Sequence, residues 1–260
     1  MKYQQSYLVT LQFLGFRFHG WQKQHKVKTV HEMVDKTLLF VFGNDNFKTI
    51  GVGRTDSKVS ANIYIFQLFT NSQIDADPFI STMNSNFPSD IKALSINEVP
   101  VDFNIIQQPK LKEYMYFFSF GEKNHPFTAP FIVGVEELLD LEKMKKGAQL
   151  FEGEHYFNKY CTKPTKHTQF KRTIETCEIQ KNTIYTANFF PEHSYILRVK
   201  GAGFLRYQIR LMMSVLFQVG SGVLSLEFIE ASLKADNDKK PLKTIAPSSG
   251  LQLYTIELMK

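Results

Sequence analysis

The spacing of apolar residues in the first part of the chain predicts a strand followed by a helix. Residues Tyr7–Phe13 read as a strand. From Thr29 to Phe42 the apolar residues recur at helical spacing. Thr29 fits the N-cap, Glu32 three residues later completes a capping box, and Gly43 is a stop signal. We therefore expect a capped amphipathic helix between Thr29 and Gly43.

The next sixty residues continue this alternation. A turn at Gly51–Gly53 precedes the β-rich run Ile63–Phe69. A shorter helix is expected at about Asp77–Asn86, and another strand near Ala93–Val99. The predicted order is strand, helix, strand, helix, strand.

The second half repeats the same theme. The expected strands are Tyr114–Phe120, Thr173–Gln180, Tyr195–Lys200 and Gln252–Leu258. The expected helices are Leu141–Phe151, Leu205–Val219 and Leu226–Lys234. This order indicates an α+β protein of two halves, each with a mostly antiparallel sheet covered by helices. Proline and polar residues cluster at Pro100–Pro109, so we place the domains at residues 1–105 and 106–260.

Composition narrows the class of protein. Of the 260 residues, 43% are hydrophobic and 22% are charged, which excludes a disordered chain. Cys161 and Cys177 cannot form a disulfide framework or a four-cysteine zinc site, so we expect a reduced, cytoplasmic protein. The first residues lack the features of a secretory signal, and no apolar run reaches membrane-spanning length.

Charge is distributed unevenly along the chain. The net charge of +6 is a weak hint by itself, but two long stretches contain no acid. Between Glu154 and Glu175, and between Glu192 and Glu227, nine cations stand without a carboxylate: Lys159, Lys163, Lys166, Lys171, Arg172, Arg198, Lys200, Arg206 and Arg210. These stretches are either a surface of positive potential for a polyanion or solvated faces that happen to lack carboxylates.

The most informative stretch runs from Gly51 to Ala61. Its two glycines permit close backbone approach of a ligand, and Arg54 and Asp56 follow them just before a predicted strand. A loop at a strand edge is a common place for functional groups. The alternative interpretation is a turn with an Arg54–Asp56 surface ion pair.

Seven segments, in order, resemble the motifs of the TruA-type transfer-RNA pseudouridine synthases over nearly the whole chain. The catalytic loop of that family, G-R-T-D-A-G-V-H-A, is similar to Gly53–Ala61. The six other segments are Phe13–Gln24 (Y-D-G-x-x-F-x-G-W-Q-x-Q), Thr29–His31 (T-V-Q), Lys112–Tyr116 (R-x-Y-x-Y), Phe151–Phe157 (F-x-G-x-H-D-F), Gly201–Arg210 (G-x-x-F-L-x-x-M-V-R) and Ala246–Leu253 (A-P-x-x-G-L-x-L).

The resemblance implies an isomerase that converts uridine to pseudouridine in RNA and uses no cofactor and no metal. Asp56 would be the catalytic carboxylate, as nucleophile or as base. Arg54 would fill the stack that the flipped base leaves, and Tyr114 would stack on the uracil. Arg210 would pair with Asp56 and keep it ionised. Without the family match, Tyr114 reads as a core aromatic that shares its face with Tyr116, and Arg210 reads as a helix-surface residue.

The chain also departs from the family pattern. Ser57-Lys58 replaces the usual Ala-Gly of the catalytic loop, Ser60 replaces its His, and Tyr156 replaces the Asp of H-D-F. The F-x-A-R arginine before Tyr114 is missing. We expect Lys58 to add a phosphate contact to the substrate-binding residues Tyr114, Arg54 and Arg210.

The sequence and the resemblance together predict a synthase of two ferredoxin-like halves. Their mostly antiparallel sheets would join into a continuous sheet with a basic RNA-binding cleft. The first half would carry the Asp56 loop, and the second the stacking Tyr114 and Arg210. The family acts at positions 38–40 in the anticodon arm of transfer RNA and is homodimeric, and no membrane contact is expected. Three alternatives stay open: an inactive RNA-binding module on the same fold, a synthase for another RNA position, and an unrelated α+β enzyme with a small anionic substrate.

Overall fold

A computed structural model describes residues 3–235 and 240–259. It contains two compact units: unit 1 is Met1–Lys110 with Leu253–Lys260, and unit 2 is Leu111–Gln252. The sequence-based division left the last strand in the second half, whereas the structure groups most of that strand with unit 1. Such a return of the chain has no local sequence signal, because it depends on contacts between residues far apart in the chain.

Unit 1 has the β-α-β-β-α-β order of a ferredoxin-like fold. Its elements are β1 (Gln5–Phe13), α1 (Val30–Phe42), β2 (Phe47–Gly51), β3 (Ser60–Thr70), α2 (Ala76–Asn86) and β4 (Ile91–Glu98). The strands pair antiparallel in the order β4-β1-β3, and β2 also pairs with β3. Strand β10 (Leu251–Leu258) lies beside β3, where Asn62 Nδ2 donates to the carbonyl oxygen of Tyr254 at 3.3 Å.

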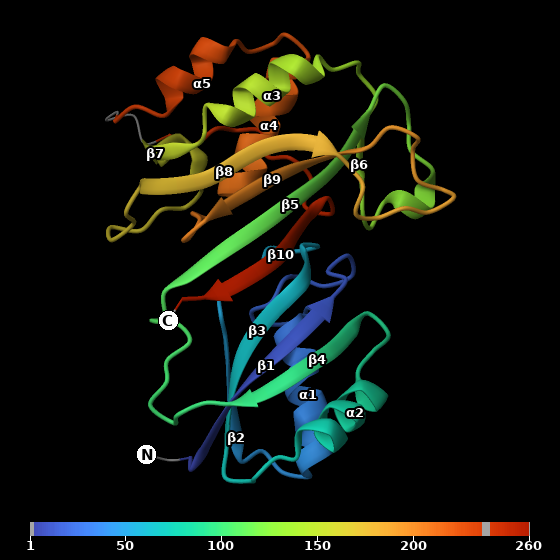
Figure 1. The fold of residues 1–260 in the computed structure, drawn as a ribbon, viewed down its shortest axis with the longest axis vertical. Coiled ribbons are helices and arrows are strands. Elements are labelled where there is room, and N and C mark those ends of the chain that lie inside the picture. Colours follow the sequence, from blue (N-terminus) through green and yellow to red (C-terminus); the bar gives the residue numbers. More distant parts are fainter. Residues whose placement is uncertain (1–2, 236–239, 260) are drawn as a thin grey trace. The chain divides into compact units, whose positions relative to one another are not determined.

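Helix α1 forms as its capping residues predict. Thr29 Oγ1 accepts a hydrogen bond from the Glu32 N–H at 3.3 Å, and the Thr29 backbone contributes to lowering the pKa of the Glu32 carboxyl. The helix ends at Gly43, whose φ of 66° is left-handed and therefore suits glycine. Helices α1 and α2 lie side by side on one face of the sheet (Figure 1). Val34 and Leu38 are completely buried, so this helical face forms the core of unit 1.

Unit 2 also consists of mostly antiparallel strands with helices on one face (Figure 1). Its strands are β5 (Lys110–Phe120), β6 (Val133–Val135), β7 (Gly153–Tyr156), β8 (Lys171–Lys181) and β9 (Tyr195–Gly201). They pair in the order β5-β9-β8-β7, and β6 alone runs parallel to its neighbour β5. The helices are α3 (Leu141–Gln149), α4 (Gln208–Gly220) and α5 (Leu226–Ser232), with the short 3-10 helices η1 (Pro126–Thr128) and η2 (Asn158–Tyr160).

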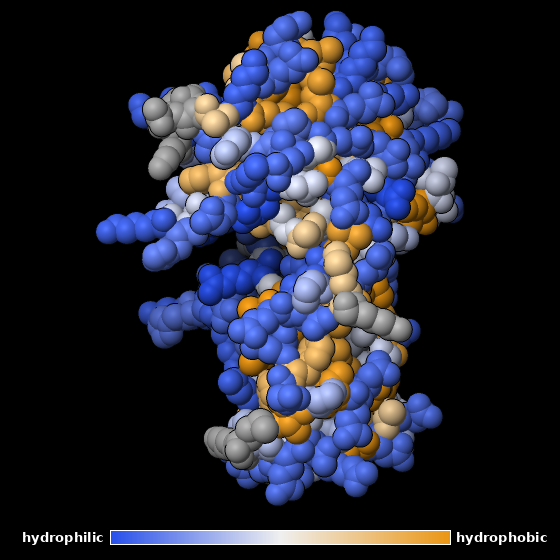
Figure 2. Space-filling view, turned by 60° about the vertical axis from the view of Figure 1, so that its left-hand side comes forward, coloured by the Kyte–Doolittle hydropathy of each residue, from blue (hydrophilic) through white to orange (hydrophobic). Residues whose placement is uncertain are grey.

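The predicted fold class, α+β with mostly antiparallel sheets flanked by helices, is confirmed. The short strands β2, β6 and β7 were not predicted, because three to five residues carry too little periodicity. Helix α4 was predicted from Leu205 but begins at Gln208, since Tyr207 has a φ of 65°. Both units present a mainly hydrophilic surface interrupted by hydrophobic areas (Figure 2). Within the described ranges, no helix is long and apolar enough to cross a membrane.

Candidate functional site

The predicted catalytic loop lies between β2 and β3 and is bonded to the segment that follows β1. The Lys58 N–H donates to the Phe18 carbonyl oxygen at 2.9 Å, and the Gly15 N–H donates to Ser60 Oγ, also at 2.9 Å. Within the loop, the Val59 N–H donates to the Asp56 carbonyl oxygen at 3.2 Å. Two motifs that are forty residues apart in the sequence therefore form one local structure around Asp56.

Two glycines allow this close approach. A Cβ atom on Gly15 would lie 2.0 Å from the Val59 carbonyl oxygen. A Cβ atom on Gly20 would lie 2.3 Å from the Thr55 carbonyl oxygen, and Gly20 also has a φ of +80°. Any side chain at either position would collide with the loop backbone, because the neighbouring atoms are backbone atoms. The glycines of the upstream motif are therefore required by the position of the loop.

A stack of aromatic rings supports the loop from the core of unit 1. Trp21 is 2% exposed and stacks on Tyr64, with ring centroids 4.1 Å apart, and on His31, at 5.0 Å. The Tyr64 hydroxyl donates to the carbonyl oxygen of Gly53, the first residue of the loop. Gly51 leaves room for this stack, since its Cβ would lie 2.3 Å from both Trp21 Nε1 and the Tyr64 hydroxyl. Trp21 is therefore a core residue that supports the loop through Tyr64.

Asp56, Arg54 and Lys58 occupy neighbouring positions on this loop. Asp56 is partly exposed, and the Arg54 side chain is exposed. A carboxylate fixed at the end of a strand and open to solvent can act on a bound ligand as nucleophile or as base. The loop thus brings together three of the five residues predicted from the sequence.

Lys58 has a conformation that explains the glycine of the family pattern. Its φ of 66° is left-handed, which costs a residue with a side chain about 1–2 kcal/mol relative to its ordinary conformations. The family has glycine at the matching position, and this chain carries lysine there. Lys58 Nζ lies 5.4 Å from the centre of the Phe16 ring, a cation–π contact that orients the exposed side chain.

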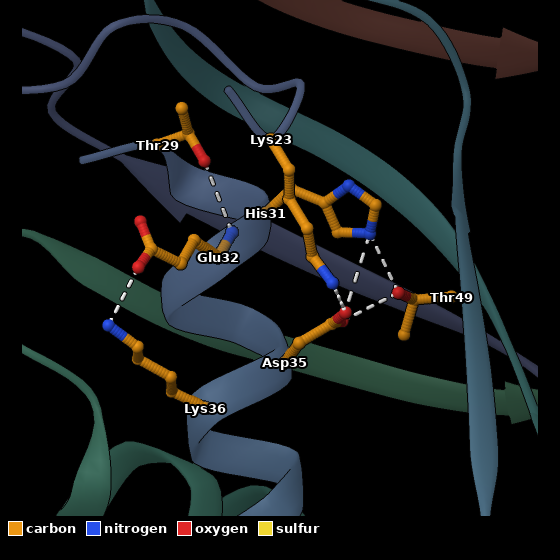
Figure 3. A network of polar contacts seen from close by, with 7 residues as sticks. All are labelled: Lys23, Thr29, His31, Glu32, Asp35, Lys36 and Thr49. Carbon is orange, nitrogen blue, oxygen red and sulfur yellow. Dashed lines mark hydrogen bonds and ion pairs between the residues drawn. The ribbon is translucent and has the colours of Figure 1, made fainter. Parts of the chain in front are cut away.

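A polar network lies at the start of α1, beside the aromatic stack (Figure 3). Thr49 Oγ1 donates to Asp35 Oδ1 at 2.6 Å and lies 2.7 Å from His31 Nε2. Lys23 forms an ion pair with Asp35. Burial lowers the pKa of His31, Asp35 opposes this shift, and Lys23 adds to it. His31 Nδ1 is buried and has no partner within the described part of the chain, so a charged imidazole would be poorly accommodated.

In unit 2, the structure distinguishes the two tyrosines of the R-x-Y-x-Y resemblance. Tyr116 is completely buried, and its hydroxyl donates to the Pro247 carbonyl oxygen at 2.7 Å. Burial raises the pKa of the Tyr116 hydroxyl. Tyr114 is partly exposed, and its ring meets Phe204 edge-on at 5.4 Å. Tyr116 is therefore a packing residue, and Tyr114 is the member of the pair whose ring reaches the surface.

Arg210 is placed by the last motif of the chain. Its Nε–H donates to the Ala246 carbonyl oxygen at 2.8 Å, and its guanidinium carbon lies 4.9 Å from the centre of the Tyr207 ring. Ala246 and Pro247 thus hold Arg210 and Tyr116 through successive carbonyl groups. The predicted pairing of Arg210 with Asp56 joins residues of different units and stays a prediction.

His155 and the two cysteines lie outside the loop around Asp56. His155 Nε2 lies 2.7 Å from the Glu152 carbonyl oxygen, which agrees with a packing role. Cys161 and Cys177 are both buried, and neither is part of a disulfide. Within the described ranges, no group of three or more His, Cys, Asp or Glu side chains could hold a metal ion.

Comparisons with known proteins agree with this fold and loop. Residues 148–257 match the family model described as tRNA pseudouridine synthase. Three curated proteins, each named tRNA pseudouridine synthase A, are similar over nearly the full length. The Listeria welshimeri protein is 28% identical over 253 residues, which are 96% of this chain and 98% of that protein. The Clostridium botulinum protein is 29% identical over 246 residues, with 95% and 96% covered. The Aquifex aeolicus protein is 28% identical over 257 residues, with 97% and 99% covered.

These observations relate the chain to one class of proteins, the tRNA pseudouridine synthases. The two α+β units, the loop around Asp56 and the full-length similarity all point to the same group of proteins. The chain is similar to the tRNA pseudouridine synthases over nearly its full length, and residues 148–257 match the model of that family.

Proposed function

We propose that the chain converts uridine to pseudouridine in the anticodon arm of transfer RNA, at positions 38–40, with Asp56 as the catalytic carboxylate. The observation that supports this most is the loop Gly53–Ala61, which glycine contacts and hydrogen bonds hold so that Asp56 is partly exposed. The names of the relatives supply the transfer-RNA substrate.

The reaction needs no net change of atoms. The bond between C1′ and N1 of the uridine breaks, the uracil turns, and a bond between C5 and C1′ forms. N1 gains a proton and C5 loses one to solvent. A single carboxylate can act at the sugar or at the ring, as nucleophile or as base. Asp56 can supply this single carboxylate, because it lies on a loop that hydrogen bonds hold in place.

Four residues would bind the RNA around this carboxylate. Arg54 would enter the space that the flipped base leaves, and Tyr114 would stack on the uracil. The partial exposure of Tyr114 and the exposure of Arg54 support these roles. Arg210 would orient the reacting groups, and Lys58 would contact a phosphate. The family also implies a homodimer, which a mass measurement in solution would test, and we place the activity in the cytoplasm.

Tritium release from RNA labelled at C5 of its uridines tests this proposal. The wild-type protein should release tritium from unmodified transfer RNA, and Asp56→Ala should release none above background. Release that survives Asp56→Ala would overturn the assignment of the catalyst. Wild-type protein that binds transfer RNA without release would instead be the inactive RNA-binding module.

The modified position is tested separately. Chemical labelling of pseudouridine followed by primer extension should stop at positions 38–40 of the transfer RNA. Stops elsewhere would leave the activity in place and change the substrate position. Protein that neither binds nor modifies RNA would fit the unrelated enzyme with a small anionic substrate.

A further inference from the structure

Four residues of unit 2 form a chain of contacts that leads away from Arg210. The guanidinium carbon of Arg206 lies 5.2 Å from the centre of the Tyr207 ring, and that of Arg210 lies 4.9 Å from the same point. Arg172, on β8, is related to Arg206 through Cys161, because both arginines influence the thiol of that residue. We call Arg172, Arg206, Tyr207 and Arg210 the arginine line.

Tyr207 holds its place in this line at a conformational cost. Its φ of 65° is left-handed, which is uncommon for a large aromatic residue. Such conformations persist where the surroundings determine them, and they cluster at functional sites. Here the left-handed residue lies immediately before α4, with Arg206 preceding it and Arg210 in the first turn of the helix. The Tyr207 ring is the shared surface against which both guanidinium groups lie.

Cys161 and Thr162 lie at the other end of the arginine line, next to Arg206. The Thr162 N–H donates to the Arg206 carbonyl oxygen at 3.2 Å. Burial raises the pKa of the Cys161 thiol, while a hydrogen bond from the Arg206 backbone and the charges of Arg172 and Arg206 oppose that shift. Both guanidinium groups therefore lie near the same side chain. Arg172 and Arg206 thus both act on the Cys161 thiol, although thirty-four residues separate them in the sequence.

Neither Arg172 nor Arg206 forms an ion pair with a carboxylate in the described part of unit 2. Arg172 is partly buried, and burial lowers the pKa of its guanidinium group. Its Nη1 donates to the Lys171 carbonyl oxygen at 2.7 Å, a neutral partner. A partly buried cation without an anion is unfavourable unless a ligand supplies the negative charge. The nearby Thr162 Oγ1 is also buried and without a partner among the described residues.

We propose that Arg172 and Arg206 bind phosphates of the RNA backbone beside the target uridine. This inference rests on the proposed function and adds a binding surface to it. A guanidinium group binds phosphate oxygens through two parallel hydrogen bonds, which suits this ligand. Several cations in this part of unit 2 suit a polyanion better than a single phosphate group. The absence of acids between Glu154 and Glu175, and between Glu192 and Glu227, keeps this surface positive.

The salt dependence of RNA binding tests the proposal. The dissociation constant of unmodified transfer RNA would be measured from about 50 to about 200 mM salt for wild type, Arg172→Ala, Arg206→Ala and Arg206→Lys. Each alanine variant should reduce the slope of log K against log salt by about 0.7–0.9, the value of one lost phosphate contact. Each should also weaken binding about tenfold at low salt. Arg206→Lys should keep the slope, because the charge is retained.

Lys145→Ala is the matched control. Lys145 lies on α3 of the same unit, is partly exposed and pairs with Glu142. Its removal lowers the charge of unit 2 by the same amount and should leave the slope unchanged. An equal slope change in this control would show a general charge effect and would overturn the proposal. Unchanged slopes in both Arg172→Ala and Arg206→Ala would overturn it as well, provided that thermal melting shows both variants folded.

This failure differs from failure of the proposed function. If wild type releases tritium, Asp56→Ala does not, and the arginine variants bind as wild type does, then only the arginine line is wrong. If wild type neither binds nor modifies transfer RNA, then the proposed function is wrong. The arginine line would then also lose the RNA ligand proposed for it. Inorganic phosphate at millimolar concentration should not displace the RNA beyond the effect of its ionic strength. Specific displacement by phosphate would indicate a site for a single anion and would overturn the proposal that the arginines bind the RNA backbone.

Discussion

Lys58 is the residue at which this chain departs most informatively from its family. Its left-handed backbone and its position between Ser57 and Val59 identify the conformation for which the family uses glycine. The lysine keeps this conformation, and its exposed side chain lies over Phe16. The conformational cost and the extra charge are therefore separable by substitution.

Replacing Lys58 by glycine should make the protein more stable than replacing it by alanine. Both changes remove the cation–π contact, but only glycine adopts the left-handed conformation without steric cost. We expect the free energy of unfolding of Lys58→Gly to be about 0.5–1 kcal/mol higher than that of Lys58→Ala. Urea denaturation of the two variants measures this difference, and equal stabilities would show that the loop relaxes around alanine.

The charge of Lys58 should appear in RNA binding. Lys58→Ala should weaken the binding of transfer RNA and reduce its salt slope by about 0.7–0.9. An unchanged slope would reject the phosphate contact. Lys58→Arg, which retains the charge, should keep the wild-type slope and serves as the control.

At the scale of elements, two glycines allow the segment after β1 to lie in close contact with the catalytic loop. Gly20→Ala would place a methyl group 2.3 Å from the Thr55 carbonyl oxygen, so the loop would have to move. We expect a loss of about 2–4 kcal/mol in stability and at least a roughly tenfold loss in kcat/KM. Gly43→Ala is the control, because Gly43 has a similar φ of +66° with nothing within 4 Å of its Cβ. It should cost about 1 kcal/mol and leave the activity unchanged.

The network at the start of α1 predicts a specific pH dependence of stability. The pKa of His31 is lowered in the folded protein, chiefly by burial. The unfolded chain therefore binds a proton at higher pH than the folded one, and stability falls as the pH drops below about 6.5. His31→Gln, which restores the residue of the family pattern, should lessen the loss of stability between about pH 7.5 and 5.5. Denaturant midpoints at both pH values measure this, and identical losses in the two proteins would contradict it.

Regular elements were predictable where a pattern was long enough or a cap marked the end. Thr29, Glu32 and Gly43 define α1 from the sequence alone. The position of Asp56 on a loop at a strand edge was also predictable from Gly51 and Gly53. The roles of Gly15 and Gly20 were not, because the atoms that would meet their Cβ atoms lie on another segment. The left-handed Tyr207 had no local signal either, since most aromatic residues avoid that conformation.

At the scale of the whole molecule, the chain returns from unit 2 to unit 1 at its end. The Met259 N–H donates to the Pro109 carbonyl oxygen at 3.0 Å, and Asn62 Nδ2 donates to the Tyr254 carbonyl oxygen at 3.3 Å. These contacts join the end of the chain to the middle and to the end of the first segment, residues 1–110. The two units are thus not consecutive pieces of chain, and the stability of the last strand should follow that of unit 1.

Two matched core variants test this coupling by hydrogen exchange. Leu38 in α1 of unit 1 and Leu216 in α4 of unit 2 are both completely buried, and either Leu→Ala change should cost about 2–5 kcal/mol. If residues 253–258 open together with unit 1, their amides should exchange faster in Leu38→Ala than in Leu216→Ala, because exchange reports the free energy of the opening that exposes each amide. Amides of β8 should show the reverse order and serve as the internal control. Faster exchange of residues 253–258 in Leu216→Ala would instead assign the last strand to the stability of unit 2.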